Sequence, residues 1–330
     1  MNRRPDSPVH RKFLSDVRTR HLLPDRARVL VAVSGGQDSL CLLKLLIDNA
    51  FTRGWDIRVG HLDHRWRSNS IYDAQTVAVL CATWKLPFHL AVAKVRLISE
   101  DAARQWRYEW LGELALSLGV SHVVTGHTAS DRAETLLFNL LRGSGSDGLA
   151  SLDWKRPLLE DVQLVRPLLG FTRNQTAEFC RVWQLPICTD VSNLDIAYRR
   201  NRIRLELLPY LERHFNPRVE QTLARTAQVL SAEISYLEAE TERLAAQVVR
   251  GERLERHVLA RAPLALQRRV VRTWLGGLLD RHPGFEQVEQ AVACLTAPNR
   301  TRTAPLAGGY LLEVRFEWLV LCSNAPPLTD

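Results

Sequence analysis

The stretch "RVLVAVSGGQDSL", residues 28–40, decides the fold. Its first six residues are rich in Val and Leu and predict a buried β-strand. The turn "SGGQDS" follows at residues 34–39, and an apolar helical pattern starts near Asp38. A strand that runs through a glycine-rich turn into a helix indicates a phosphate-binding loop, since the N-terminus of a helix attracts anions.

The composition of this turn narrows the chemistry. Gly35 and Gly36 have no Cβ, so backbone N–H groups can close on an anion, and Ser34 and Ser39 add hydroxyl groups. No Gly-Lys-Ser/Thr follows, which excludes a Walker A loop. Asp38 beside an anion calls for a cation, and a Mg²⁺ that bridges phosphates would supply it. The alternative is a tight turn in which Asp38 only caps the helix.

Strand and helix patterns alternate through the first half of the chain. We predict strands at 28–33, 56–62, 88–93 and 121–127, and helices at 38–50, 71–84, 100–119 and 131–142. This alternation predicts an α/β fold with a parallel sheet covered on both faces. Ligands of such sheets bind beyond the carboxyl ends of the strands. The segments "SGGQDS", "HLDHRWR" (61–67) and "GHTASDRAE" (126–134) should therefore meet on one rim.

The second rim segment carries His61, Asp63, His64 and Arg67. His61 and Asp63 alternate, so they lie on the same side of an extended chain. We expect a nucleotide or substrate contact here. Zinc ligation and a plain polar loop are the alternatives, and no further His/Cys cluster at ligand spacing supports zinc.

The third rim segment places Asp131 and Glu134 three residues apart, on one face of a helix. His127 precedes this helix and Arg142 closes it. Asp131 could share a metal with Asp38, whereas a capping or salt-bridge role is the alternative for Glu134.

The helix expected at 100–119 carries "ARQWRY", which puts Arg104, Arg107 and Tyr108 on one side. These residues either face the rim or form part of an exposed helix laced with Arg–Glu pairs.

Charge and composition point to a partner class. The 330 residues carry a net charge of +8, and only five of the 44 basic residues are Lys. Residues 196–273 hold fifteen Arg and nine Glu. Arg suits phosphate contact and base stacking, so a nucleic acid partner is indicated, with a solvated helical surface as the alternative. The chain shows no transmembrane stretch, no secretory signal and no C-x-x-C pair among six cysteines, so we expect a cytoplasmic protein without a membrane partner.

The second half reads differently from the first. "GSGSDG" (143–148) matches G-x-G-x-x-G but follows a helix, so we interpret it as a loop rather than a dinucleotide site. We predict a helix at 172–183, a long helical pattern from about residue 216, and a β-hairpin around Gly308–Gly309. The expected domains are 1–210, catalytic, and 211–330, smaller and mainly helical.

Taken together, the motifs resemble a known family. "SGGQDS" resembles the PP-loop of N-type ATP pyrophosphatases, which cleave ATP between the α- and β-phosphates. Together with "HLDHRWR", "AARQWRYEWL", "GHTASDRAETLLFNLLRGSGSDGL" and "DVSNLDIAYRRNRIRLELLP", it resembles the tRNA(Ile)-lysidine synthase family over about residues 29–211. The resemblance implies an adenine nucleotide alpha hydrolase-like PP-loop ATPase domain.

The resemblance also implies an activity. The family uses ATP to adenylate the wobble cytidine of a CAU-anticodon isoleucine tRNA, and L-lysine then displaces AMP to give lysidine. A PP-loop enzyme of tRNA 2-thiolation is the alternative, although such enzymes commonly use C-x-x-C pairs. A nucleotide-sensing or RNA-binding module without catalysis is a further alternative. Assembly as a homodimer stays open.

The site residues that the resemblance implies fall into four groups. The ATP-binding residues are Ser34, Gly35, Gly36, Gln37, Asp38, Ser39, His61 and Asp63. The catalytic residues are Asp38, Asp131, His127, Glu134, Arg107 and Arg142. Asp38 and Asp131 are the implied Mg²⁺ ligands. The implied tRNA-binding residues are Arg199, Arg200, Arg202 and Arg204, and the domain expected at 211–330 is implied to bind tRNA as well.

Overall fold

A computed structural model of the chain describes residues 6–65, 70–94, 100–150, 152–188, 195–279 and 281–323. Its contacts divide the chain into two compact units, residues 1–231 and 232–330. The helix α10 (Val219–Val248) contributes residues to both units. The predicted boundary near residue 210 stays a prediction.

The first unit is built on a six-stranded sheet with the order β3-β2-β1-β4-β6-β5. Its strands are β1 (Arg28–Ala32), β2 (Asp56–Asp63), β3 (Phe88–Val92), β4 (His122–Thr125), β5 (Lys155–Leu159) and β6 (Val162–Val165). All neighbouring pairs are parallel except β5 with β6. The strand order reverses at β1 and β4, which is where open α/β sheets bind their ligands.

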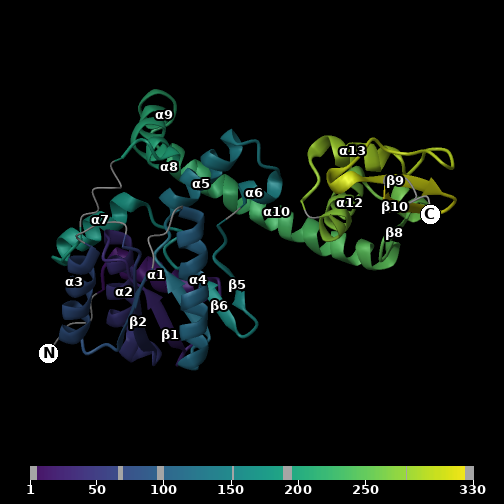
Figure 1. Ribbon diagram of the computed structural model, residues 1–330. Helices are drawn as coiled ribbons and strands as arrows, with labels where there is room; N and C mark the ends of the chain where they lie inside the picture. The colour runs from purple at the N-terminus through teal and green to yellow at the C-terminus, as the bar shows by residue number, and fades with distance from the viewer. Residues whose placement is uncertain are drawn as a thin grey trace. The chain divides into compact units, whose positions relative to one another are not determined.

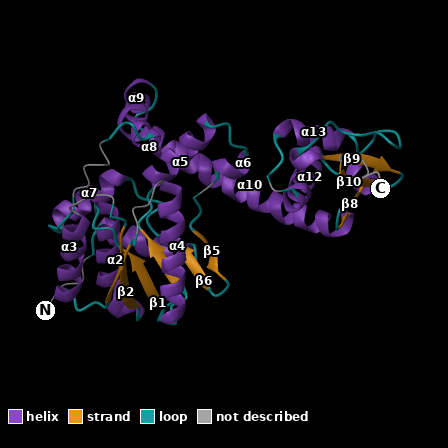
Figure 2. Cartoon of the chain, in the orientation of Figure 1, coloured by secondary structure: helices purple, strands orange, loops and turns teal. Residues whose placement is uncertain are grey.

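Helices cover both faces of this sheet, as Figure 2 shows. The covering helices are α1 (Pro8–Thr19), α2 (Gln37–Arg53), α3 (Ser70–Thr83), α4 (Glu100–Ser117) and α7 (Arg173–Val182). The first unit also contains α5 (Ala129–Leu141) and the single turn α6 (Ser146–Leu149), which contact each other. Side chains of β1 alternate between the faces: Val29 and Val31 join the core formed with α1, α2 and α7, whereas Leu30 joins the core formed with α4. The sheet is thus buried on both sides, as parallel sheets require.

The remaining helices of the first unit follow α7. They are α8 (Arg199–Arg202), a π-helical turn η2 (Ile203–Leu207), α9 (Leu208–His214) and the start of α10 (Figure 1). The π turn lies just before Pro209, which has no N–H to donate to the carbonyl group four residues earlier. Leu137 of α5, Ile203 and Leu208 form a small buried cluster that fixes these helices against α5.

The second unit pairs a small antiparallel sheet with helices. The sheet has the order β7-β8-β10-β9, with β7 (Val249–Arg250), β8 (Arg253–Glu255), β9 (Tyr310–Arg315) and β10 (Trp318–Ser323). The helices are α11 (Arg256–Ala260), α12 (Leu264–Leu278) and α13 (Phe285–Ala293), and a 3₁₀ turn η3 spans Ala307–Gly309. Their apolar faces close a core that includes Val270, Leu275 and Leu319.

Several local predictions needed correction. The hairpin β5–β6 lay outside the sequence-based prediction, because its strands are short and β5 alternates between exposed and half-buried residues. The segment "GSGSDG" does open a helix, the single turn α6. The turn between β9 and β10 lies at Phe316 and Glu317, whereas Gly308–Gly309 reverse the chain one step earlier, where Arg302 pairs with Glu313. Within the described ranges, we find no helix that is both long and apolar enough to cross a bilayer.

Candidate active site

The loop after β1 has the geometry of an anion cradle. Gly35 adopts φ +86°, a left-handed conformation that favours glycine. The hydroxyl groups of Ser34 and Ser39 lie 3.2 Å apart, and the Ser34 backbone N–H donates to the Ser39 hydroxyl. Gly36 is the N-cap of α2 and has no capping side chain. The first N–H groups of α2 are therefore not covered by a side-chain cap, as a phosphate site requires.

A glycine brings the third rim segment against this loop. A Cβ on Gly126 would lie 3.0 Å from the carbonyl carbon and oxygen of Asp38 and from the Ser39 nitrogen. Real Cβ atoms seldom come so close to a backbone, so only glycine lets the β4–α5 connection pass the first turn of α2. This close passage brings Asp38 and Asp131 to one place.

Three of the predicted acidic side chains converge on a single arginine. Arg173, the first residue of α7, donates to Asp38 at 3.2 Å, to Asp131 at 2.7 Å and to Glu134 at 2.7 Å. Thr176, one turn along α7, also donates to Asp38. The structure thus places Asp38, Asp131 and Glu134 together at the rim, with Arg173 as their common partner.

Electrostatics sets the charge of this cluster. Burial raises the pKa of Asp38, and Asp131 adds to the effect, while Arg173 and Thr176 oppose it. Burial also penalises ionised Asp131, but Arg173, His127 and the Thr128 N–H outweigh it and lower the pKa of Asp131. Burial opposes the charge of Arg173, yet its carboxylate partners outweigh burial and raise its pKa. The cluster therefore holds a fixed guanidinium among carboxylates at neutral pH.

Local sequence explains why Asp131 and Arg173 are well placed. Thr128 and Asp131 form a capping box that starts α5, and Thr172 and Gln175 form another that starts α7. Ser130 connects the two helices, because its hydroxyl accepts from the Arg173 backbone N–H at 2.8 Å and donates to Glu220. The charged residues thus sit on the rigid first turns of two neighbouring helices.

Arg204 adds a second cation to Glu134. Its guanidinium makes a two-pronged contact with the Glu134 carboxylate, both distances being 2.7 Å. The sequence assigned Arg204 to tRNA binding, and the structure places it against the acidic cluster. Glu134 is 4% exposed and holds two arginines at once.

The second rim segment lies at the end of β2. His61 is buried and its Nδ1 lies 2.7 Å from the Val33 carbonyl oxygen, next to the PP-loop. Asp63 is buried and accepts from the Arg65 N–H at 2.8 Å. Arg107 of α4 lies 3.4 Å from Nε2 of His64, so this helix does face the rim. Arg67 lies outside the described residues.

Burial keeps the rim histidines neutral. It lowers the pKa of His127 to about 3, with Arg166 and Arg107 adding and Asp131 opposing. Burial and Arg107 lower the pKa of His64 to about 4. Nδ1 of His127 lies 2.9 Å from the Thr125 hydroxyl, so the ring has a defined orientation. At neutral pH both rings offer hydrogen bonds without charge.

Arg142 lies away from the acidic cluster. It caps the C-terminus of α5, eleven residues after Asp131 and therefore about 16 Å along the helix. There it joins a groove of about 560 Å³. The groove is lined by Phe138, Leu141, Arg142, Arg199, Arg202, Ile203, Glu206, Leu207 and Tyr210. Arg200 and Arg142 lie over the Phe138 ring at 5.3 Å and 5.1 Å.

Sequence reasoning missed Arg173 and Thr176. The signal was present, since "TRNQ" is a capping box that starts a helix with an arginine in its first turn. The preceding strand, β6, was not recognised. Without that strand, the rule that strand ends meet on one rim could not be applied to α7.

The carboxylates beside the PP-loop fit Mg²⁺. Asp38 and Asp131 offer carboxylate oxygens beside the PP-loop, and Mg²⁺ in phosphate sites takes one or two carboxylates with phosphate oxygens and water. Among the described residues, no group of three or more His, Cys, Asp or Glu side chains is placed to hold a metal by itself. Two carboxylates next to an anion cradle therefore fit a metal that arrives with the phosphates of a nucleotide.

Comparisons with known families agree with this geometry. A model described as "PP-loop domain" matches residues 6–211, more than half of the chain, and one described as "TilS substrate binding domain" matches residues 254–315. The PP-loop match shows that the domain is an ATP-utilising one. The U34-tRNA thiolase NcsA from Methanococcus maripaludis has a TM-score of 0.57 at 14% identity, covering 68% of this chain and 78% of that one. This likeness shows the fold alone.

Curated relatives extend the match to nearly the whole chain. The tRNA(Ile)-lysidine synthase of Gloeobacter violaceus is 60% identical over 91% of this chain and 92% of its own length. That of a Nostoc species is 47% identical over 95% and 96%, respectively. The chloroplastic enzyme of Pyropia yezoensis is 34% identical over 95% of both chains. The chain therefore belongs to the tRNA(Ile)-lysidine synthase family of PP-loop enzymes.

Proposed function

We propose that this protein joins L-lysine to C2 of the wobble cytidine, position 34, of an isoleucine tRNA with a CAU anticodon. ATP supplies the energy, and the products are lysidine, AMP and pyrophosphate. The observation that carries the proposal is the acidic cluster of Asp38, Asp131 and Glu134 beside an intact PP-loop, in a chain of this family. The cytoplasmic location and the homodimer both stay predictions.

The first step is adenylation of the cytidine. The C2 oxygen attacks the α-phosphorus, the bond to the β-phosphate oxygen breaks, and pyrophosphate leaves. We assign the pyrophosphate to the PP-loop, residues 34–39. The hydroxyl groups of Ser34 and Ser39 lie there beside the uncapped N-terminus of α2, whose backbone N–H groups attract anions. His61 and Asp63 border the same loop and are assigned to the nucleotide.

The second step is displacement of AMP by lysine. The amine attacks C2, the bond from C2 to the adenylate oxygen breaks, and the nitrogen loses a proton. No covalent bond to the enzyme forms, so orientation of the reactants supplies much of the rate. Arg107 on α4 lies at the rim and is assigned to the phosphate of the adenylate, whose negative charge it would offset. His127 is neutral and is assigned to orienting the reactants through hydrogen bonding.

Mg²⁺ belongs to the proposal through Asp38 and Asp131. Bound there with ATP, the ion would offset the charge that develops on the leaving pyrophosphate. Arg173 contacts both carboxylates and holds their side chains in one orientation. We assign Arg173 to positioning these two acids.

The groove around Phe138 is assigned to the tRNA. Arg142, Arg199 and Arg202 line it, and Tyr210 is 55% exposed at its wall. Arginines interleaved with aromatic rings suit RNA, since bases stack on rings and guanidinium groups bind phosphates. Arg200 over Phe138 extends the same surface.

The decisive test is mass analysis of the wobble nucleotide after incubation of the enzyme with ATP, lysine and a CAU tRNA transcript. We expect the mass increase of lysine addition less water, with repeated turnover to AMP and pyrophosphate only when lysine and tRNA are both present. Replacement of oxygen by sulfur in the presence of a sulfur donor would favour the thiolation alternative. ADP as product, or turnover without tRNA, would refute both.

A further inference from the structure

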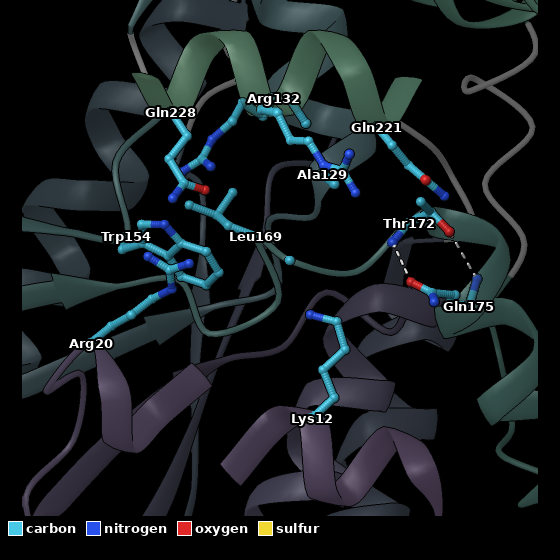
Figure 3. A pocket seen from close by; sticks show the side chains of 13 residues that line it. Lys12, Arg20, Ala129, Arg132, Trp154, Leu169, Thr172, Gln175, Gln221 and Gln228 are labelled. Carbon is cyan, nitrogen blue, oxygen red and sulfur yellow. Dashed lines mark hydrogen bonds between the residues drawn. The ribbon is translucent and has the colours of Figure 1, made fainter. Parts of the chain in front are cut away.

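A second cavity lies in the first unit, apart from the site described above (Figure 3). Its volume is about 310 Å³. Its wall combines α1, the loop before β5, the first turns of α5 and α7, and the part of α10 that belongs to the first unit. The lining residues are Lys12, Arg20, Ala129, Arg132, Trp154, Leu169, Gly170, Thr172, Gln175, Gln221, Ala224, Arg225 and Gln228.

The wall of this cavity is cationic. Lys12, Arg20, Arg132 and Arg225 contribute four positive charges, and no carboxylate is among its described lining residues. Behind the wall, Asp16 lies 2.9 Å from Lys12 and 3.9 Å from Arg20, so one acid serves two of the cations. An excess of positive charge in a partly enclosed space favours an anion.

Arg132 is buried in this wall, close to other cations. This side chain is 3% exposed and donates twice to the Leu152 carbonyl oxygen, at 2.9 Å and 2.7 Å. Burial lowers its pKa to about 10, Asp153 opposes the effect, and Arg20 and Arg166 add to it. Like charges that approach one another in this way are relieved by a counter-ion.

Two buried donors on the same wall lack an acceptor. The indole N–H of Trp154 and the Nε–H of Arg20 are both buried and have no hydrogen-bond partner within the described part of the chain. The Arg20 guanidinium lies 3.9 Å from the centre of the Trp154 ring, which fixes both groups. Folded proteins seldom leave buried donors without an acceptor, so the protein's described residues alone do not satisfy this wall.

A glycine keeps the cavity open. A Cβ on Gly170 would come within 2.6 Å of the Lys12 ammonium nitrogen and 2.8 Å of an Asp16 oxygen. Any side chain at this position would therefore displace the lysine that points into the cavity in Figure 3.

The cavity and the acidic cluster lie on different faces of the same two helices. On α5, Ala129 and Arg132 line the cavity, whereas Asp131 and Glu134 bind Arg173. On α7, Gln175 lines the cavity, whereas Arg173 faces the acids. None of the cavity's lining residues contributes a side chain to the acidic cluster, so an anion there is not the nucleotide of the PP-loop.

We propose that this cavity is a binding site for a phosphate group. Four cations and glutamine amides from several elements surround a space large enough for a phosphate with some hydration, and their positive charge exceeds that of the one acid beside them. The phosphate comes either from the RNA backbone or from free phosphate in solution. The site does not depend on the lysidine reaction, because its occupancy is measured without lysine or turnover.

The test is calorimetric titration of the full-length protein with inorganic phosphate, with a non-hydrolysable ATP analogue at saturation to fill the PP-loop. We compare the wild type with Lys12→Gln, Arg225→Gln and Trp154→Phe, and use Arg11→Gln as the matched control. Arg11 lies next to Lys12 on α1, is exposed, and pairs with Asp6. Thermal melts verify that each variant is folded.

We expect one saturable phosphate site in the wild type and in Arg11→Gln. Lys12→Gln and Arg225→Gln should weaken it about tenfold each, and Trp154→Phe, which reduces the ring that holds the Arg20 guanidinium, about threefold. Equal affinity in all five proteins, or no saturable binding in the wild type, would overturn the proposal.

The source of the phosphate is decided by tRNA binding to the same proteins. If the site binds a phosphate of the RNA backbone, Lys12→Gln and Arg225→Gln weaken tRNA binding and each lowers its salt dependence by about one ion. Inorganic phosphate then competes with tRNA. For free phosphate, tRNA affinity is unchanged and phosphate still binds to the tRNA complex. If the wild-type protein binds phosphate but forms no lysidine, the proposed function is refuted and the phosphate site still stands.

Discussion

The two ends of α5 differ in how their charges are satisfied. At its N-terminal end, Asp131 and Glu134 are paired with Arg173, and Glu134 also with Arg204. At its C-terminal end, Arg142 is exposed and shares a groove with Arg199 and Arg202. Glu206 is the one carboxylate that lines the described part of this groove.

This contrast separates two kinds of functional surface. Burying a network of paired acids and arginines costs desolvation free energy, but the pairs hold these side chains in fixed positions. An exposed set of arginines contributes little to folding, but it gains free energy by releasing counter-ions when a polyanion binds. The first end of α5 therefore suits chemistry, and the second suits RNA.

The largest expected effect is at Asp38. Asp38→Ala removes a proposed Mg²⁺ ligand at the PP-loop, so we expect AMP formation to fall by about a thousandfold or more. Filter binding should show tRNA affinity within about twofold of the wild type, because the groove is untouched. Asp56→Ala, at an exposed position on β2, is the control. A matching loss of tRNA binding would indicate a folding defect.

Arg173 is expected to affect both stability and activity. Arg173→Ala leaves Asp38, Asp131 and Glu134 without their common partner, so the free energy of unfolding should drop by about 3 kcal/mol or more. Chemical denaturation measures this change. Arg181→Ala on the same helix, exposed and paired with Glu178, should change stability by less than about 0.5 kcal/mol.

A second substitution sharpens this result. Adding Asp131→Asn to Arg173→Ala removes one of the uncompensated charges, so part of the stability should return. If the double variant is as unstable as the sum of the two single variants, Arg173 does not act through these acids.

The groove should respond through affinity alone. Arg142→Gln and Arg199→Gln should each raise the tRNA Kd about threefold to tenfold and lower its salt dependence by about one ion, with kcat unchanged at saturating tRNA. Binding isotherms at several salt concentrations measure both quantities. Arg181→Gln serves as the exposed control. A fall in kcat would instead place Arg142 near the adenylate phosphate.

The smallest expected effect concerns pH. Burial and Arg107 hold the folded-state pKa of His64 at about 4, below its unfolded value of about 6.5. As the pH falls, the unfolded chain therefore binds a proton at His64 before the folded protein does. The free energy of unfolding decreases as the pH drops from about 6.5 towards about 4. His64→Asn should reduce this loss of Tm by a few degrees. An unchanged pH dependence of Tm would show that His64 titrates normally.

The sheet and its rim could be predicted because their patterns are local. Val29 and Val31 alternate with Leu30 in β1, and the glycines of the PP-loop follow directly. The meeting of Asp38 with Asp131 needed only the rule that parallel strand ends share an edge. These inferences use residues close in sequence to their own strand.

Long-range pairings could not be predicted in the same way. Arg173 is 135 residues from Asp38, and the hydrogen bond between them depends on β6, a strand of four residues without a strong pattern. Arg204 reaches Glu134 over 70 residues through a π-helical turn. In both cases tertiary packing, rather than local preference, decides which arginine meets which acid.

The close passage at Gly126 has a consequence for the evolution of this enzyme. Its Cβ position is blocked by the backbone of Asp38 and Ser39, which cannot rotate aside as a side chain could. In a library that samples every amino acid at this position, nearly all substitutions should be lost, including alanine. Position 126 thus limits how far sequences can diverge while the nucleotide loop and the acids remain in register.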